Sequence, residues 1–118
     1  MAEDTTPGPA PLDPELARFL QHLTVERRLA ARTVAMYTEA LRRLQAFAAA
    51  DGVALPAAAP HHVRHWMTQL RHRGLASRSI AIALAAWRGL YRWWAREGVV
   101  RANPVDGLRP PKAPRPLP

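Results

Sequence analysis

The chain has 118 residues with 17 Lys and Arg against 9 Asp and Glu, so its formal net charge is +8. It contains no cysteine, which excludes disulfides, thiol catalysis and cysteine metal ligands. Neither a secretion leader nor a membrane-length apolar run is recognisable, so we expect a soluble, intracellular protein without membrane contact. A positive charge of this size favours polyanionic partners.

Proline-rich ends flank a single predicted domain. Eight of the twelve prolines lie in residues 1–12 and 109–118, which also hold few large apolar side chains. Such segments cannot bury enough surface to offset the entropy lost on ordering, so we expect flexible tails there. Residues 13–108 remain, and they are enough for one small core.

The first two predicted helices have clear start and stop signals. The first opens at Asp13 as its N-cap, with Pro14 in the first turn, and fades near Arg28. The second spans about residues 31–50 and is closed by Gly52, because glycine readily adopts the left-handed conformation. Apolar residues recur at helical spacing along both. The inward positions are Leu16, Phe19, Leu20 and Leu23 on the first helix, and Val34, Tyr37, Leu41, Leu44 and Ala48 on the second.

Two further long helices and a short one complete the predicted fold, which is all-α with no strand. The third spans about residues 60–74; the fourth follows Ser77 as its N-cap and closes at Gly98. Asn103 and the proline after it predict a last short helix that ends near Leu108. The inward positions are Val63, Trp66, Met67 and Leu70 on the third helix, and Ile80, Leu84, Trp87, Tyr91 and Trp94 on the fourth.

A long stretch of the chain lacks any carboxylate. From Gly52 to Arg96 there are seven arginines, four histidines and no Asp or Glu. An ordinary solvated surface mixes both signs, so this stretch indicates a surface for an anion, most simply nucleic acid.

The outward faces of the second and fourth helices carry the basic residues. On the fourth helix, small residues lie between the arginines, which would let the helix backbone approach a phosphate chain closely. Hydroxyls and free N–H groups at its N-terminus also favour an anion. The candidate DNA-binding residues are Arg32, Thr33 and Arg43 on the second helix, and Ser77, Arg78, Ser79, Arg88 and Arg92 on the fourth.

Other notable side chains carry weaker signals. His61, His65 and His72 share one side of the third helix, but the region supplies no Cys, Asp or Glu to complete a zinc site, so we expect a polar or phosphate-facing surface. Trp93 points away from the inward stripe, which indicates a protein contact, a seat beneath an arginine or a cover for a helix end.

No catalytic pattern is present. The chain has no paired carboxylates, no glycine-rich phosphate loop and no Ser/His/Asp spacing, and both Tyr37 and Tyr91 fall on inward stripes. The residues therefore predict a binding module.

Four ordered segments resemble a known family. They are VERRLAARTVAMY (25–37), LASRSIAIALAAWRGLYRWWAREG (75–98), ANPVDGL (102–108) and PKAPRPLP (111–118). Together they resemble the N-terminal core-binding domain of Xer-type tyrosine recombinases, and the last segment is most similar to the XerC branch. The family usually has serine before the second helix, where this chain has Ala30.

The resemblance implies a SAM-like bundle of four helices plus a short C-terminal helix, in which helices two and four grip a recombination half-site on double-stranded DNA. It places Arg88 at the arginine of the family's Ala-Leu-Arg-Ser pattern. It also implies a parent enzyme of the bacterial cytoplasm that cuts and rejoins DNA strands, as in chromosome dimer resolution or DNA integration. That parent would act without metal or nucleotide cofactor, in a tetramer with a paired recombinase.

By the same resemblance, the catalytic arginines, lysine, histidines and tyrosine belong to a second domain beyond an interdomain linker at 109–118. This chain alone would then be monomeric and unable to cleave DNA. Two alternatives stay open: a helical adaptor that docks an acidic protein through Trp93 and arginines, and a free-standing DNA-binding regulator.

Overall fold

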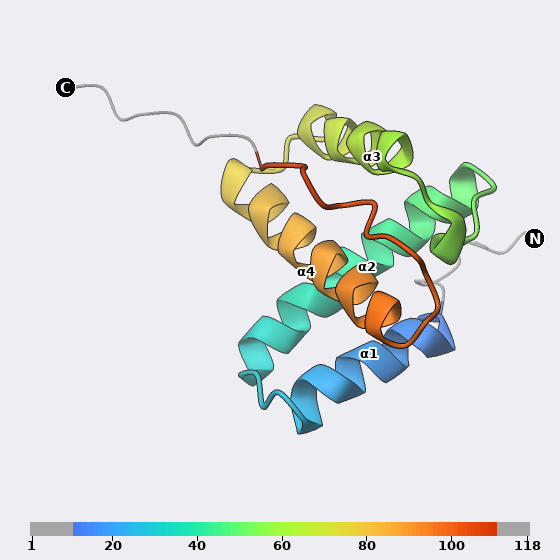
Figure 1. The fold of residues 1–118 in the computed structure, drawn as a ribbon. Coiled ribbons are helices and arrows are strands. Elements are labelled where there is room, and N and C mark those ends of the chain that lie inside the picture. The colour runs from blue at the N-terminus through green and yellow to red at the C-terminus, as the bar shows by residue number, and fades with distance from the viewer. Residues whose placement is uncertain (1–10, 111–118) are drawn as a thin grey trace, which may run out of the picture.

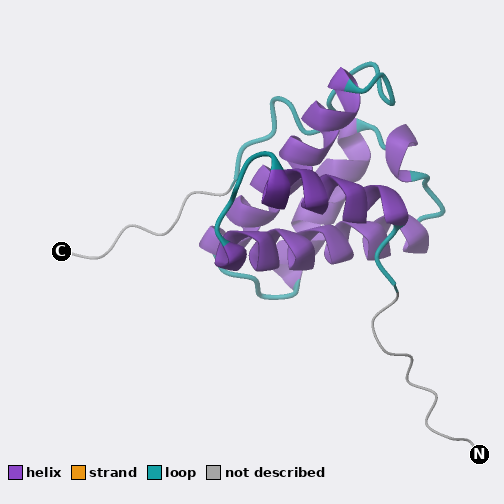
Figure 2. Ribbon diagram, turned by 90° about the horizontal axis from the view of Figure 1, so that it is seen from below, coloured by secondary structure: helices purple, strands orange, loops and turns teal. Residues whose placement is uncertain are grey.

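The structure is a computed structural model that describes residues 11–110, and within that range the chain is helical with no strand (Figure 2). The predicted all-α fold with four main helices is confirmed. A short 3-10 helix that the sequence did not predict, η1, follows the second helix. The elements are α1 (Pro14–Val25), α2 (Ala31–Ala50), η1 (Leu55–Ala57), α3 (Pro60–His72) and α4 (Ser77–Arg96).

The start of α1 agrees with its predicted cap, but its end does not agree with the predicted one. The Asp13 carboxylate accepts a hydrogen bond from the Glu15 N–H at 2.8 Å. The helix ends at Val25 rather than near Arg28, because Arg28 adopts a left-handed backbone conformation with φ 52°. The Leu29 N–H then bonds back to the Leu23 carbonyl at 3.1 Å, which turns the chain toward α2.

The predicted N-cap of α4 is wrong by one residue. Ala76 is the N-cap, because its carbonyl accepts the first helical hydrogen bond, from the Ile80 N–H at 3.0 Å. Ser77 is therefore the first helical residue, and no side chain caps this helix. α2 likewise begins after Ala30 without a side-chain cap, as the alanine at this position predicts.

The segment predicted to form a last short helix is a turn. The Asn103 side-chain oxygen accepts from the Val105 N–H at 2.9 Å, and the Asp106 N–H bonds to the Asn103 carbonyl at 3.1 Å. Gly107, with φ 87°, then ends the turn before a helix can continue. Figure 1 shows this segment running back alongside α4, and the fully buried Val105 anchors it to the core.

The core is built around α4, which packs across α2 and also contacts α1 and α3 (Figure 1). Large aromatic side chains fill it, and the polar atoms of three of them bond to chain segments on other elements. Trp87 donates to the Ala40 carbonyl at 2.8 Å, Trp66 to the Asp51 carboxylate at 2.7 Å, and Tyr91 to the Leu55 carbonyl at 2.7 Å. All predicted inward positions are buried except Val34, Tyr37 and Met67, which are half-buried.

Most of the two predicted tails, residues 1–12 and 109–118, falls outside the described residues. At the N-terminal boundary, Leu12 packs partly buried against the core, and Gln45 of α2 bonds to both the Pro11 carbonyl and the Asp13 N–H. Ordered contacts therefore begin just before the predicted cap. Across residues 11–110, no helix is both long and apolar enough to cross a membrane.

Candidate nucleic-acid interface

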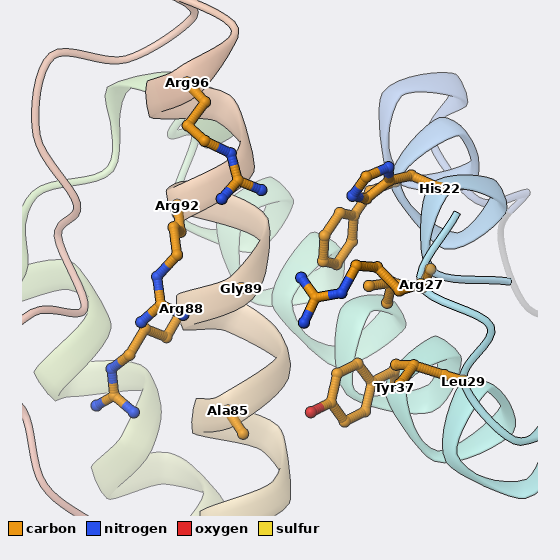
Figure 3. Close-up of a pocket in the computed structure, with 11 residues that line it drawn as sticks. His22, Arg27, Leu29, Tyr37, Ala85, Arg88, Gly89, Arg92 and Arg96 are labelled. Atoms are coloured by element: carbon orange, nitrogen blue, oxygen red, sulfur yellow. The ribbon is translucent and has the colours of Figure 1, made fainter. Parts of the chain in front are cut away.

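A cavity of about 330 Å³ lies between α4 and the C-terminal end of α1, and we call it the basic cavity. Within residues 11–110, its polar lining consists of four arginines, one histidine and one tyrosine, and no carboxylate lines it. Figure 3 shows arginines projecting from α4 on one wall and Arg27 extending toward them from the opposite wall. The lining residues are Phe19, His22, Leu23, Arg27, Leu29, Tyr37, Ala85, Arg88, Gly89, Arg92 and Arg96.

A second, smaller hollow of about 120 Å³ lies between α2 and the N-terminal half of α4. Arg43 and Ser79 line it together with apolar side chains such as Met36. Arg43 is already paired with Glu39 of its own helix at 3.9 Å, so part of its charge is compensated locally. The structure thus brings one predicted residue from each helix to a shared surface here.

Arg88 lies on the rim of the basic cavity, but its guanidinium also holds the C-terminal segment. It donates to the Leu108 carbonyl at 2.6 Å, while the Arg88 carbonyl accepts from the Asn103 side chain at 3.1 Å. In Figure 3 its side chain points away from Arg27. Arg88 therefore links the candidate interface to the segment that leaves the domain.

The remaining predicted residues lie at helix starts. Arg32 and Thr33 are in the first turn of α2, and Ser77 and Arg78 are in the first turn of α4. The two arginines are exposed, whereas Thr33 and Ser77 are half-buried. Because α2 and α4 cross, these two first turns lie apart (Figure 1). The predicted residues therefore form no single cluster: Arg88 and Arg92 share the basic cavity, and Arg43 and Ser79 share the smaller hollow.

The contribution of α1 to this surface was not predicted from the sequence. His22 and Arg27 complete the wall opposite α4. Arg96, one helical turn beyond Arg92, belongs to the outward face already predicted for α4 and also lines the cavity. An Arg27-Arg28 doublet directly before the second predicted helix was the available signal. The doublet did not show toward which helix its side chains point, because the chain turns here through the left-handed Arg28 rather than through a glycine.

Trp93 lies beneath an arginine, which was one of its predicted roles. The predicted exposure to a protein partner is wrong, because Trp93 is only 6% exposed. It packs against Phe19 and His22 of α1, with the Arg18 guanidinium 4.5 Å from the centre of its ring. Hydrogen bonds to Glu97 and Glu15 raise the pKa of Arg18. The observation that favoured an adaptor is thereby removed.

Neither the tyrosines nor the histidines form a recognisable reactive site. Burial raises the pKa of Tyr91, whose hydroxyl donates to a backbone carbonyl, so it is a structural donor. Tyr37 lines the basic cavity instead of being fully inside the core. His61, His65 and His72 are exposed. Within residues 11–110 no group of three or more side chains is placed to hold a metal ion.

An acid-free helix and arginines on two walls of one cavity define a small helical domain suited to binding a polyanion. The sequence profile of the phage integrase N-terminal SAM-like domain matches residues 16–98. The chain belongs to this family, and its predicted resemblance to Xer-type recombinases is confirmed.

Bacterial relatives that are similar to the chain carry the name of an enzyme. Tyrosine recombinase XerC 1 of Ralstonia nicotianae is 47% identical over 119 residues, which cover 98% of this chain and 36% of the relative. Tyrosine recombinase XerC of Ralstonia pickettii is 46% identical, with 89% and 33% covered. XerC of Pseudomonas aeruginosa strain LESB58 is 39% identical, with 88% and 35% covered. The chain thus spans about a third of the length of these relatives, and no solved structure matches it.

Proposed function

We propose that this chain is the DNA-binding part of a XerC-like tyrosine recombinase and that it grips a recombination half-site with the face formed by α2 and α4. One observation carries the proposal. α4 has no carboxylate from its first residue to its last, and its arginines line a cavity whose other wall is also basic. Phosphate contacts from arginine, serine and threonine would fix the position of the domain on the duplex.

The supporting geometry runs along α4. At its N-terminal half, Ser79 lies beside Arg43 of α2; at its C-terminal half, Arg88 and Arg92 lie in the basic cavity with Tyr37 of α2. Arg32, Thr33, Ser77 and Arg78 extend the same proposal to the first turns of both helices. We propose direct phosphate contacts for the arginines and hydrogen bonds from the hydroxyls.

The parent protein proposed from the relatives cuts and rejoins DNA strands in the bacterial cytoplasm through a tyrosine nucleophile, without a metal or nucleotide cofactor. In that protein the catalytic residues would come from a second domain. Paired recombinase subunits would assemble as a tetramer on two DNA sites, while this chain alone would be a monomer.

The test is binding of the chain to a short labelled DNA duplex, measured by fluorescence anisotropy across a salt series. We expect weak binding. The logarithm of the association constant should fall linearly with the logarithm of the salt concentration, with a slope of about −0.9 per neutralised phosphate. Binding that is unchanged between low and moderate salt would contradict the proposal. Binding of the chain to an acidic polymer such as polyglutamate, together with no binding to the duplex, would also contradict it.

Substitutions locate the binding face. Arg78→Ala and Arg88→Ala should weaken binding while helicity by circular dichroism stays at the wild-type level. Arg64→Ala on the exposed side of α3 removes the same charge away from this face and should have less effect. Arg88→Gln keeps a donor toward Leu108 but removes the charge, so it separates DNA binding from support of the C-terminal segment.

A further inference from the structure

The basic cavity gathers positive charge from two separate parts of the chain. Arg92 and Arg96 come from consecutive turns of α4, while Arg27 comes from the junction that follows α1. In Figure 3 the guanidinium of Arg27 points across the cavity toward α4, and that of Arg96 points toward His22 on the opposite wall. Arg92 runs along α4 beside Arg88, so positive charge borders the same space from both walls while all three side chains stay accessible to solvent.

In the part of the chain that the structure describes, no acidic group compensates this charge. Within residues 11–110, no ion pair or hydrogen bond engages the guanidinium groups of Arg27, Arg92 or Arg96, whereas Arg18 and Arg43 are both paired with glutamates. No Asp or Glu among the described residues lines the cavity. Like charges that face one another across a confined space repel, and a bound anion would remove that repulsion.

Resting on the proposed function, we propose that the basic cavity seats a single backbone phosphodiester of the bound DNA, held by Arg27, Arg92 and Arg96. The end of α1 is then a third part of the DNA interface, beside α2 and α4. Guanidinium groups suit this ligand because their planar donors match two phosphate oxygens at once.

The rest of the lining favours a backbone phosphate over a base or a free nucleotide. The apolar side of the cavity consists of side chains that are committed to packing: Phe19 is buried against Trp93, and Leu23 is buried in the core. The indole of Trp93 is itself covered by Arg18, Phe19 and His22. Phe19 and Trp93 therefore offer no open face for base stacking, and the one other ring with a hydroxyl on the lining, Tyr37, is half-buried.

The experiment compares the salt dependence of duplex binding by the wild-type chain with that of Arg27→Ala, Arg92→Ala, Arg96→Ala and the triple variant. Because all three arginines would neutralise the same phosphate, we expect the triple variant to lose about one unit of the salt slope, not three. Arg64→Ala is the charge-matched control for the single variants, and urea unfolding of each variant shows that it is folded. A loss of three units in the triple variant, or of none, overturns the proposal.

The DNA side supplies a second measurement. Duplexes with one uncharged methylphosphonate at successive positions should reveal a position that weakens wild-type binding but has no effect on the triple variant. If no position behaves in this way while the wild-type chain still binds DNA with a normal salt slope, the phosphate seat is wrong and the proposed function stands. If the wild-type chain does not bind duplex DNA, the proposed function itself fails. If polyglutamate displaces the labelled duplex as effectively as unlabelled DNA does, the cavity binds an acidic protein instead. This result also overturns the phosphate seat.

Discussion

At the N-terminal end of α1 the charged side chains have partners, whereas near its C-terminal end three arginines of the basic cavity have none among residues 11–110. Asp13 caps the helix, and Arg18 bonds to Glu15 at 3.3 Å and to Glu97 at 2.8 Å. Arg27 at the other end bonds to no carboxylate within residues 11–110. Both ends of α1 lie against α4, so contact with that helix does not distinguish the two arginines. Arg18 has acidic partners and is structural, whereas Arg27 is available to a ligand.

The backbone conformation also differs between the two ends of α1. The first turn of α1 has a side-chain cap and a proline, both of which favour a helix start. At the other end, Arg28 adopts a left-handed conformation that non-glycine residues rarely take, and α2 begins after Ala30 without a side-chain cap. Departures from local preference concentrate where binding is needed, so this end is where we expect function.

Trp93 separates the two ends, and its removal should have the largest effect. Its ring centre lies 5.5 Å from that of Phe19 and 5.8 Å from that of His22, so it joins α4 to the middle of α1. We expect Trp93→Ala to lower the free energy of unfolding by about 3 kcal/mol, since a large buried side chain leaves a cavity. Urea unfolding measures this. Val99→Ala, at an exposed valine, is the control; equal losses in both variants would contradict the assigned packing.

Most of the fold followed from local signals in the sequence. Helical spacing of apolar residues predicted the four helices, and the predicted bounds of α2 are those observed, because Gly52 marks its end unambiguously. The errors occurred where a signal was weak. Ser77 resembles an N-cap but lies one residue inside α4, and the Asn103 cap starts a turn that Gly107 stops.

The candidate site was less predictable than the fold. Charge patterning found the arginines of α4 because a helix repeats every 3.6 residues. It missed Arg27, since the approach of the α1 end to α4 depends on tertiary packing and on the left-handed Arg28. It also gave no sign that Arg88 bonds to the Leu108 carbonyl, twenty residues along the chain.

Removal of the N-cap at the N-terminal end of α1 should have the next largest effect. Asp13→Ala removes the acceptor for the Glu15 N–H and a negative charge at the helix N-terminus, so we expect a loss of about 1.5 kcal/mol in unfolding free energy. Asp13→Asn keeps a capping oxygen and should lose much less. Duplex binding should change little in either variant. A clear fall in affinity would mean that the two ends are not functionally distinct.

Supplying a cap at the other end should have a slightly smaller effect of opposite sign. Ala30→Ser gives the first turn of α2 a side-chain acceptor, so we expect a gain of about 1 kcal/mol in unfolding free energy. Ala30→Gly, which lacks the hydroxyl, is the comparison that separates capping from backbone freedom. The charge of the cavity is unaltered, so the salt slope of DNA binding should stay at the wild-type value. No gain in stability would show that the Ala30 position cannot present a capping oxygen.

The smallest effect concerns the left-handed residue beside Arg27. Arg28→Gly and Arg28→Ala remove the same charge, but only glycine takes φ 52° without strain. We expect the glycine variant to be more stable than the alanine variant by about 0.5 kcal/mol. Glycine relieves the backbone strain of the folded state, but its greater conformational freedom in the unfolded chain offsets part of that gain.

The affinity of the Arg28 variants for DNA should not follow their stability. A glycine here loosens the junction that directs Arg27 into the basic cavity, so the more stable variant should bind the duplex no better than the alanine variant. Tighter binding by the glycine variant would mean that the strained junction does not position Arg27.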